Sequence, residues 1–264
     1  ASSTATDWMA LAMGRFGYSD DAYVYMIDDG TGYTDYLAAM RTYIEQTYAA
    51  NNGVLHSVKA TEWHRAVVAI AALGGDPTDF GTYNGQPINL IADGIYDRGR
   101  TTSLGRQGLN GWIWGLIALD SLRYEIPDGA FYSRDEILLE ILRRQLPDGV
   151  ALSGSTADPD MTAMALQALA PYYNSEKSYV YVQKARGETV TKTVRQVADE
   201  AIDCLSALQL DTGDFTSWGT ENVESTDQVT VALCSLGIDP LTDPRFIKNG
   251  NTLLDGILRY RMAD

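Results

Sequence analysis

Two acidic side chains stand out as groups that could donate or accept protons. Asp160 lies in the segment Asp158-Pro159-Asp160-Met161, at the start of a long apolar stretch, and Glu62 begins another such stretch. Two carboxyl groups that flank a glycosidic bond can hydrolyse it, and a single positioned acid can protonate a substrate. An enzymatic role for this chain would therefore fall first on Asp160, together with Glu62.

Aromatic and polar side chains also gather at the starts of the apolar stretches. Aromatic surfaces with a few fixed polar groups are typical of ligand-binding pockets. Asn110, Trp112 and Asp160 are the preferred candidates, because each begins an otherwise apolar segment. The full set of predicted ligand-binding residues is Trp63, His64, Arg65, Asn110, Trp112, Trp114, Asp160, Thr162 and Gln228.

The same residues have a purely structural interpretation. Asp158 suits the N-cap of a helix, Glu62 can pair with Arg65, and Ser225 with Gln228 matches a capping box. The tryptophan rings can simply fill a core. The sequence leaves both interpretations open.

The histidines and cysteines do not form a metal-binding pattern. His56 and His64 are the two histidines, and Cys204 and Cys234 are the two cysteines. A catalytic zinc ion needs three converging protein ligands, and this spacing does not assemble them. We therefore expect no metal or other cofactor, and two buried thiols.

The composition narrows the choice of partners. The chain has 35 acidic and 20 basic residues, and its formal net charge is −15. Nucleic acids and anionic membrane surfaces attract basic proteins, and no apolar run is long enough to span a bilayer. We expect no nucleic-acid binding and no membrane insertion. The partner would be an unknown small molecule, a glycan or a protein, and the isolated domain would be monomeric.

The chain contains an internal repeat. The string LGGDP at 73–77 recurs as LGIDP at 236–240, and ATDW at 5–8 recurs as ATEW at 60–63. Five segments carry these strings or a similar mixture of small and large apolar residues. Their almost wholly apolar surfaces predict helices that are covered on all sides. These inner segments lie near 6–16, 60–74, 109–122, 159–171 and 225–237.

Amphipathic segments alternate with the inner ones. They lie near 34–49, 88–97, 134–145, 192–209 and 250–261. One-faced helices that alternate with fully covered helices favour an inner ring wrapped by an outer ring. We therefore predict an all-α protein, an α/α toroid of about five inner/outer helix pairs in a single domain, residues 1–264. An open solenoid is the alternative.

One stretch, 178–194, departs from the helical pattern. Tyr179 and Tyr181 alternate with valines, and Gly187 supplies a turn before further Val and Thr residues. This pattern predicts a small β-hairpin inserted between two helices.

Several segments resemble a known repeat family. The turns QLPDG at 145–149 and QLDTGDF at 209–215 each follow an outer segment, as in the prenyltransferase and squalene-cyclase repeat. The strings TEWHRAVVAIAALGGDP, QGLNGWIWGLIALDS, DPDMTAMALQAL and SLGIDPLTDPRFIKNG are similar to repeat domains of secreted or surface proteins of Gram-positive bacteria. They resemble cobalamin-carrier toroids more distantly. The resemblance covers nearly the whole chain and implies the α/α toroid of the terpenoid-cyclase fold.

This chain lacks a residue that each of the chemistries implied by the resemblance would require. A protein prenyltransferase would hold zinc with Asp, Cys and His, but no cysteine precedes an inner segment. A terpene cyclase would carry an Asp-x-Asp-Asp acid, whereas 158–161 reads DPDM. The likeness to cobalamin carriers implies a corrinoid as one conceivable ligand.

The combined expectation is a non-catalytic ligand-binding or adhesion module of an exported bacterial surface protein. Its pocket would lie at the rim where the inner helices begin. The extracellular or cell-surface location follows from the resemblance alone. The alternatives are a cyclase-like or carbohydrate-active enzyme that uses Asp160 with Glu62, and a corrinoid-binding domain.

Overall fold

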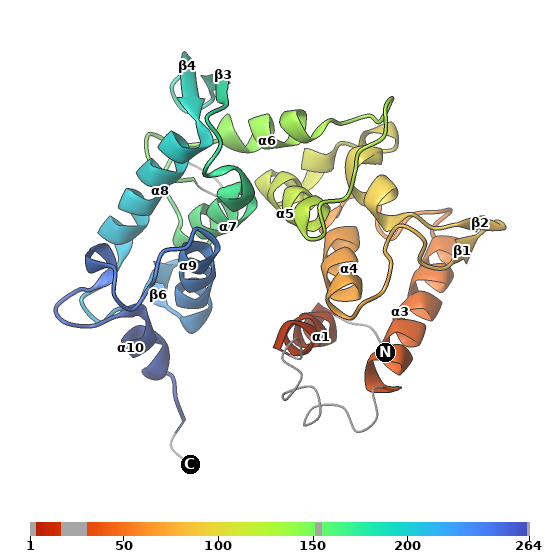
Figure 1. Cartoon of the computed structure of the whole chain (residues 1–264), viewed down its shortest axis with the longest axis horizontal. Coiled ribbons are helices and arrows are strands. Elements are labelled where there is room, and N and C mark those ends of the chain that lie inside the picture. Colours follow the sequence, from red (N-terminus) through yellow and green to blue (C-terminus); the bar gives the residue numbers. More distant parts are fainter. Residues whose placement is uncertain (1–3, 17–30, 151–154, 263–264) are drawn as a thin grey trace. The chain divides into compact units, whose positions relative to one another are not determined.

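A computed structural model describes residues 4–16, 31–150 and 155–262, and most of its regular structure is helical (Figure 1). The chain divides into two compact units, residues 1–137 and 138–264, and the boundary falls inside a helix. The prediction of a mainly helical chain is confirmed, and the described residues also form two small antiparallel hairpins, at 82–87 and 216–221, that the sequence did not predict. The toroid and the single domain stay predictions.

The first unit is built around helix α4, which packs against α1 and α5. These three helices match the inner segments expected near 6–16, 60–74 and 109–122. The unit comprises α1 (Thr4–Phe16), α3 (Thr31–Ala50), α4 (Thr61–Ala72), β1 (Thr82–Tyr83), β2 (Gln86–Pro87), the π-helix η1 (Ala92–Tyr96), the 3-10 helices η2 (Arg98–Arg100) and η3 (Leu104–Gln107), α5 (Leu109–Asp120) and the start of α6 (Arg134–Leu142).

The second unit is built around α7, which packs against α8 and α9. Leu166, Ile202, Leu205 and Phe215 are among the fully buried side chains of its core. The unit comprises the end of α6, α7 (Pro159–Leu169), η4 (Ala170–Tyr172), β3 (Ser178–Gln183), β4 (Glu188–Thr193), α8 (Val194–Leu208), β5 (Thr216–Ser217), β6 (Thr220–Glu221), α9 (Val223–Ser235), η5 (Pro244–Phe246) and α10 (Leu253–Leu258).

Polar side chains cap the helices, mostly as their types predict. The Asp158 carboxylate accepts a hydrogen bond from the Met161 amide at 3.0 Å, and Pro159 occupies the first turn of α7. The capping box predicted for Ser225 and Gln228 is wrong, because Asn222 is the N-cap of α9. Ser225 lies inside the helix, where its hydroxyl donates to Asn222 Oδ1 at 2.9 Å.

The predicted β-hairpin is confirmed. Strands β3 and β4 pair antiparallel with Tyr179 opposite Lys192 and Tyr181 opposite Val190 (Figure 1). Side chains of a strand point alternately to its two faces, so the tyrosines are buried while Val180 is exposed. This alternation is the one that the tyrosine–valine pattern predicts.

The internal repeat is visible in the backbone. Gly74 and Gly237, in LGGDP and LGIDP, have φ of 79° and 74°. The amide that follows each glycine donates to the carbonyl five residues earlier, at 2.9 Å in both copies. Left-handed glycine with such a bond is a common helix ending, and helices α4 and α9 both end in this way.

Two of the expected outer helices differ from the prediction. Segment 88–97 contains the π-helix η1 and is followed by the 3-10 helix η2, and segment 250–261 contains only the short helix α10. The first copy reads LIADGI at 90–95, where the second reads LLDGI at 253–257. The extra residue is accommodated by i→i+5 bonding, as between the Asp97 amide and the Ala92 carbonyl at 2.9 Å.

Candidate functional site

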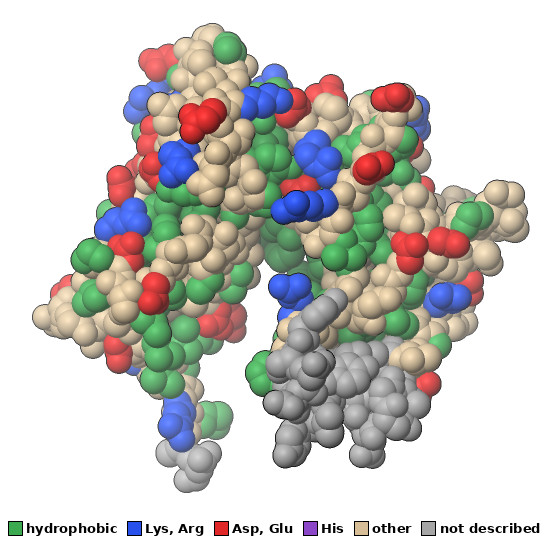
Figure 2. All heavy atoms as spheres, in the orientation of Figure 1, with side chains coloured by type: hydrophobic (Ala, Val, Ile, Leu, Met, Phe, Trp, Pro, Cys, Tyr) green, Lys and Arg blue, Asp and Glu red, His purple; other side chains and the backbone are tan. Residues whose placement is uncertain are grey.

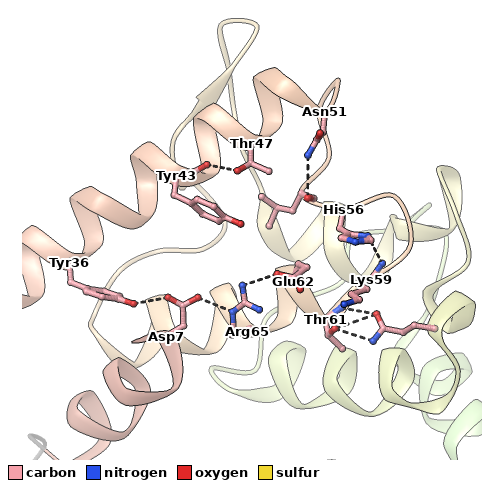
Figure 3. Close-up of polar contacts among 12 residues, drawn as sticks. Asp7, Tyr36, Tyr43, Thr47, Asn51, His56, Lys59, Thr61, Glu62 and Arg65 are labelled. Atoms are coloured by element: carbon pink, nitrogen blue, oxygen red, sulfur yellow. Dashed lines mark hydrogen bonds and ion pairs between the residues drawn. The ribbon is translucent and has the colours of Figure 1, made fainter. Parts of the chain in front are cut away.

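The first candidate group, at the start of α4, is an ion-pair network (Figure 3). Arg65 Nε lies 2.8 Å from Asp7 Oδ2, and its guanidinium also contacts Glu62 at 2.7 Å. The Tyr36 hydroxyl donates to the second oxygen of Asp7 at 2.6 Å, and burial together with this bond raises the pKa of Tyr36 to about 12. Glu62 and Arg65 therefore pair as the structural interpretation predicts, and tie α1, α3 and α4 together.

Trp63 belongs to a second, buried polar cluster, whose hydrogen-bonded residues come from α3, α4 and the π-helix η1. Its indole N–H donates to the Tyr48 hydroxyl at 2.7 Å, and that hydroxyl donates to Asp93 at 2.9 Å. The Arg98 guanidinium carbon lies 4.3 Å from the centroid of the Trp63 ring. Burial raises the pKa of Asp93. Because Trp63 is fully buried, it supports the core of the unit and does not present a surface to a ligand.

His64, on α4, is also fully buried, and its side chain faces the π-helix. Its Nε2 lies 2.9 Å from the Gly94 carbonyl oxygen, while Nδ1 has no partner among the described atoms. Burial lowers the pKa of His64 to about 4. Across the described residues, no three His, Cys, Asp or Glu side chains form a cluster that could hold a metal ion.

The two tryptophans of helix α5 differ in their exposure. Trp112 is buried and packs edge-on against Tyr132, with ring centroids 5.2 Å apart. Trp114 is half-buried, and its ring lies 5.1 Å from that of Trp8 on α1. Asn110 is one turn before Trp114 on the same helix face, and its Oδ1 is buried without a hydrogen-bond partner.

The same arrangement of exposure recurs on α7. Residues 111–120 and 161–170 share one pattern of buried and half-buried positions along ten residues. Asp160, Met164 and Gln167 thus form a half-exposed stripe that corresponds to Asn110, Trp114 and Ile117 on α5. We call these two sets the half-exposed stripes of α5 and α7.

The ligand-binding residues that were predicted in the second unit differ in exposure, since some are half-buried and one is fully buried. Thr162 is fully buried, and its hydroxyl donates to the Val150 carbonyl at 3.1 Å. Gln228 is half-buried, and its Oε1 accepts from Gln167 at 2.9 Å. Asp160 Oδ1 is buried and has no partner in the described part of the chain. Asp160 and Gln228 are therefore partly accessible to solvent, and Thr162 is not.

Four further properties describe the cavities, thiols, helices and surface charge of the described residues. A pocket of about 10 Å³ beside Gln145 and Thr162 holds no more than a water molecule. Cys204 is buried as expected, but Cys234 is exposed, and both are free thiols. No helix in the described ranges is long and apolar enough to cross a bilayer. On the face shown in Figure 2, the described Lys and Arg side chains lie scattered among Asp and Glu.

Sequence reasoning missed one conspicuous residue. Trp218 lies in the turn between β5 and β6, is 81% exposed, and has a φ of 54°. The signal was present in the sequence, because Trp-Gly stands where two comparable turns of the chain read Asn-Gly. Comparisons with protein families, curated proteins and solved structures found no significant match to this chain.

Proposed function

We propose that the chain is a non-catalytic ligand-binding or adhesion module of an exported bacterial surface protein. The observation that carries the proposal is the half-exposed stripe of α5, where Trp114 meets Trp8 and the half-exposed Asn110 has a side-chain oxygen without a hydrogen-bond partner. Such a surface suits an organic ligand with an apolar face and a hydrogen-bond donor. The exported location rests on the family resemblance.

Native mass spectrometry of the purified chain with cyanocobalamin, an oligomer of N-acetylglucosamine, or oleic acid tests this proposal. Binding of one probe should be lost in Trp114→Ala and Asn110→Ala. Tyr43→Ala removes an exposed aromatic side chain of α3 instead, and it should bind as the wild type does. Binding that survives both α5 substitutions would place the site elsewhere.

We also propose that the helix pairs close into an α/α toroid. The alternation of fully covered and one-faced helices supports closure. Small-angle X-ray scattering should then give a radius of gyration of about 18 Å, the value for one compact body of this length. A markedly larger radius would favour an open solenoid.

The second candidate function is acid catalysis by Asp160, which the unpartnered buried Oδ1 favours. Its neighbour Asp158 is already engaged, by the Met161 amide and by the Ser217 hydroxyl at 3.0 Å. Incubation with squalene and with geranylgeranyl diphosphate would reveal a cyclic product. That product should vanish in Asp160→Asn.

A further inference from the structure

Within the described residues, three two-residue turns that join antiparallel partners use the same left-handed backbone pair, but one of them has an unusual residue. Asn84-Gly85 has φ of 51° and 75°, and Asn249-Gly250 has 50° and 83°. Trp218-Gly219 has 54° and 80°. Asparagine tolerates this conformation well, whereas a bulky residue in it is a genuine outlier. The third turn therefore contains a residue that its backbone disfavours.

Packing does not explain the tryptophan either. Trp218 is 81% exposed, so its ring contributes little to the core of the second unit. Tryptophan is enriched among the residues that dominate the affinity of protein interfaces. Trp218 thus has the character of an anchor for a partner.

The surroundings of Trp218 are acidic. The hydroxyl of Ser217, the residue before Trp218, donates to Asp158, the N-cap of α7, at 3.0 Å. Strand β6 carries Glu221, and Glu224 lies in the first turn of α9. Between 196 and 244 the chain has ten Asp and Glu residues and no Lys or Arg.

Basic side chains outside residues 196–244 neutralise only part of the negative charge of this segment. Arg259 pairs with Glu221 at 2.6 Å and lies 3.6 Å from Asp214, while Lys192 pairs with Glu200 at 2.6 Å and Arg245 with Asp243 at 2.8 Å. Burial and the nearby charge of Glu224 raise the pKa of Asp227. The surface next to the Trp218 turn therefore attracts cations.

We propose that the Trp218 turn is a docking point for a basic polypeptide segment, in which an Arg or Lys side chain lies against the indole face. Charge complementarity selects this partner over a polyanion, and an arginine guanidinium combines stacking on tryptophan with hydrogen bonds to carboxylates. The Trp218 turn belongs to the second unit and the half-exposed stripe of α5 to the first, so this proposal goes beyond the ligand site proposed above.

Fluorescence anisotropy with a labelled decapeptide of alternating Arg and Gly tests the proposal. Trp218→Asn installs the residue of the other two turns and should weaken binding about tenfold, within the range of a desolvated cation–π contact. Val182→Thr removes another exposed apolar side chain of the same unit and should leave the affinity unchanged. Thermal unfolding should show Trp218→Asn to be at least as stable as the wild type.

Equal affinity of the wild type and Trp218→Asn would overturn the proposal, because binding would then reflect net charge alone. Absence of peptide binding would overturn it as well. The proposal would also be overturned if the wild type bound an N-acetylglucosamine oligomer or phosphatidylcholine vesicles in place of the peptide, and Trp218→Asn lost that binding. Trp114→Ala should keep peptide binding, which separates this test from that of the ligand site.

Discussion

His64 Nε2 lies 2.9 Å from the carbonyl oxygen of Gly94, inside the π-helix of the first unit. A carbonyl oxygen only accepts, so Nε2 carries the proton and Nδ1 of the neutral ring does not. The π-helix places this carbonyl opposite α4, and it exists because the first repeat copy has one residue more than the second.

Acid should destabilise the first unit through His64. Its pKa is about 4 in the folded chain, below the ordinary value of about 6.5. Between these values the unfolded chain binds a proton that the folded chain does not, so stability falls as pH drops from about 6.5 to 4. The loss should approach about 3 kcal/mol at pH 4.

Urea unfolding at pH 7 and pH 4.5 measures this effect. His64→Gln keeps an N–H donor for Gly94 but does not titrate, so its stability should change less with pH than that of the wild type. Carboxylates contribute to both curves, and the difference between the two isolates His64. Parallel curves would contradict the prediction.

Asp7→Ala should destabilise the first unit by about 2–3 kcal/mol, since it leaves the buried Arg65 with one of its two carboxylates. Tyr36→Phe removes only one hydrogen bond to Asp7 and should cost about 1 kcal/mol. Denaturant unfolding followed by circular dichroism compares them. A larger effect for Tyr36→Phe would show that the hydroxyl, and not the ion pair, holds α1 in place.

The sequence predicted what depends on local pattern. The periodicity of 159–171 and the cap at Asp158 located α7, and alternating tyrosines located the β3–β4 hairpin. Exposure along a helix depends on its neighbours, so sequence did not separate buried Trp112 from half-buried Trp114, or Cys204 from Cys234. The π-helix depends on a single extra residue, which only the comparison of the two repeat copies exposes.

Gly94→Ala should destabilise the first unit, because the π-helix approaches α4 very closely there. An added Cβ would lie 2.3 Å from Trp63 Cβ, and overpacking of this kind costs about 1–3 kcal/mol. At Gly115, on α5, the nearest atom to an added Cβ is 3.3 Å away. Thermal unfolding should therefore rank Gly115→Ala as the milder change, and the reverse order would mean that α4 can shift away.

The two turns that follow helices α6 and α8 should depend on one glutamine each. Gln145 Nε2 contacts the Asp148 carbonyl at 3.0 Å and Glu200 at 2.7 Å, and Gln209 Nε2 contacts the Gly213 carbonyl at 3.2 Å. Both glutamines are buried. Replacement by alanine leaves a buried carbonyl unsatisfied, which costs about 1–3 kcal/mol. Gln167→Ala, at a half-buried position of α7, should cost less in the same chemical unfolding assay. If all three substitutions had equal effects, the glutamines would act as general packing residues and not as the clasps of these turns.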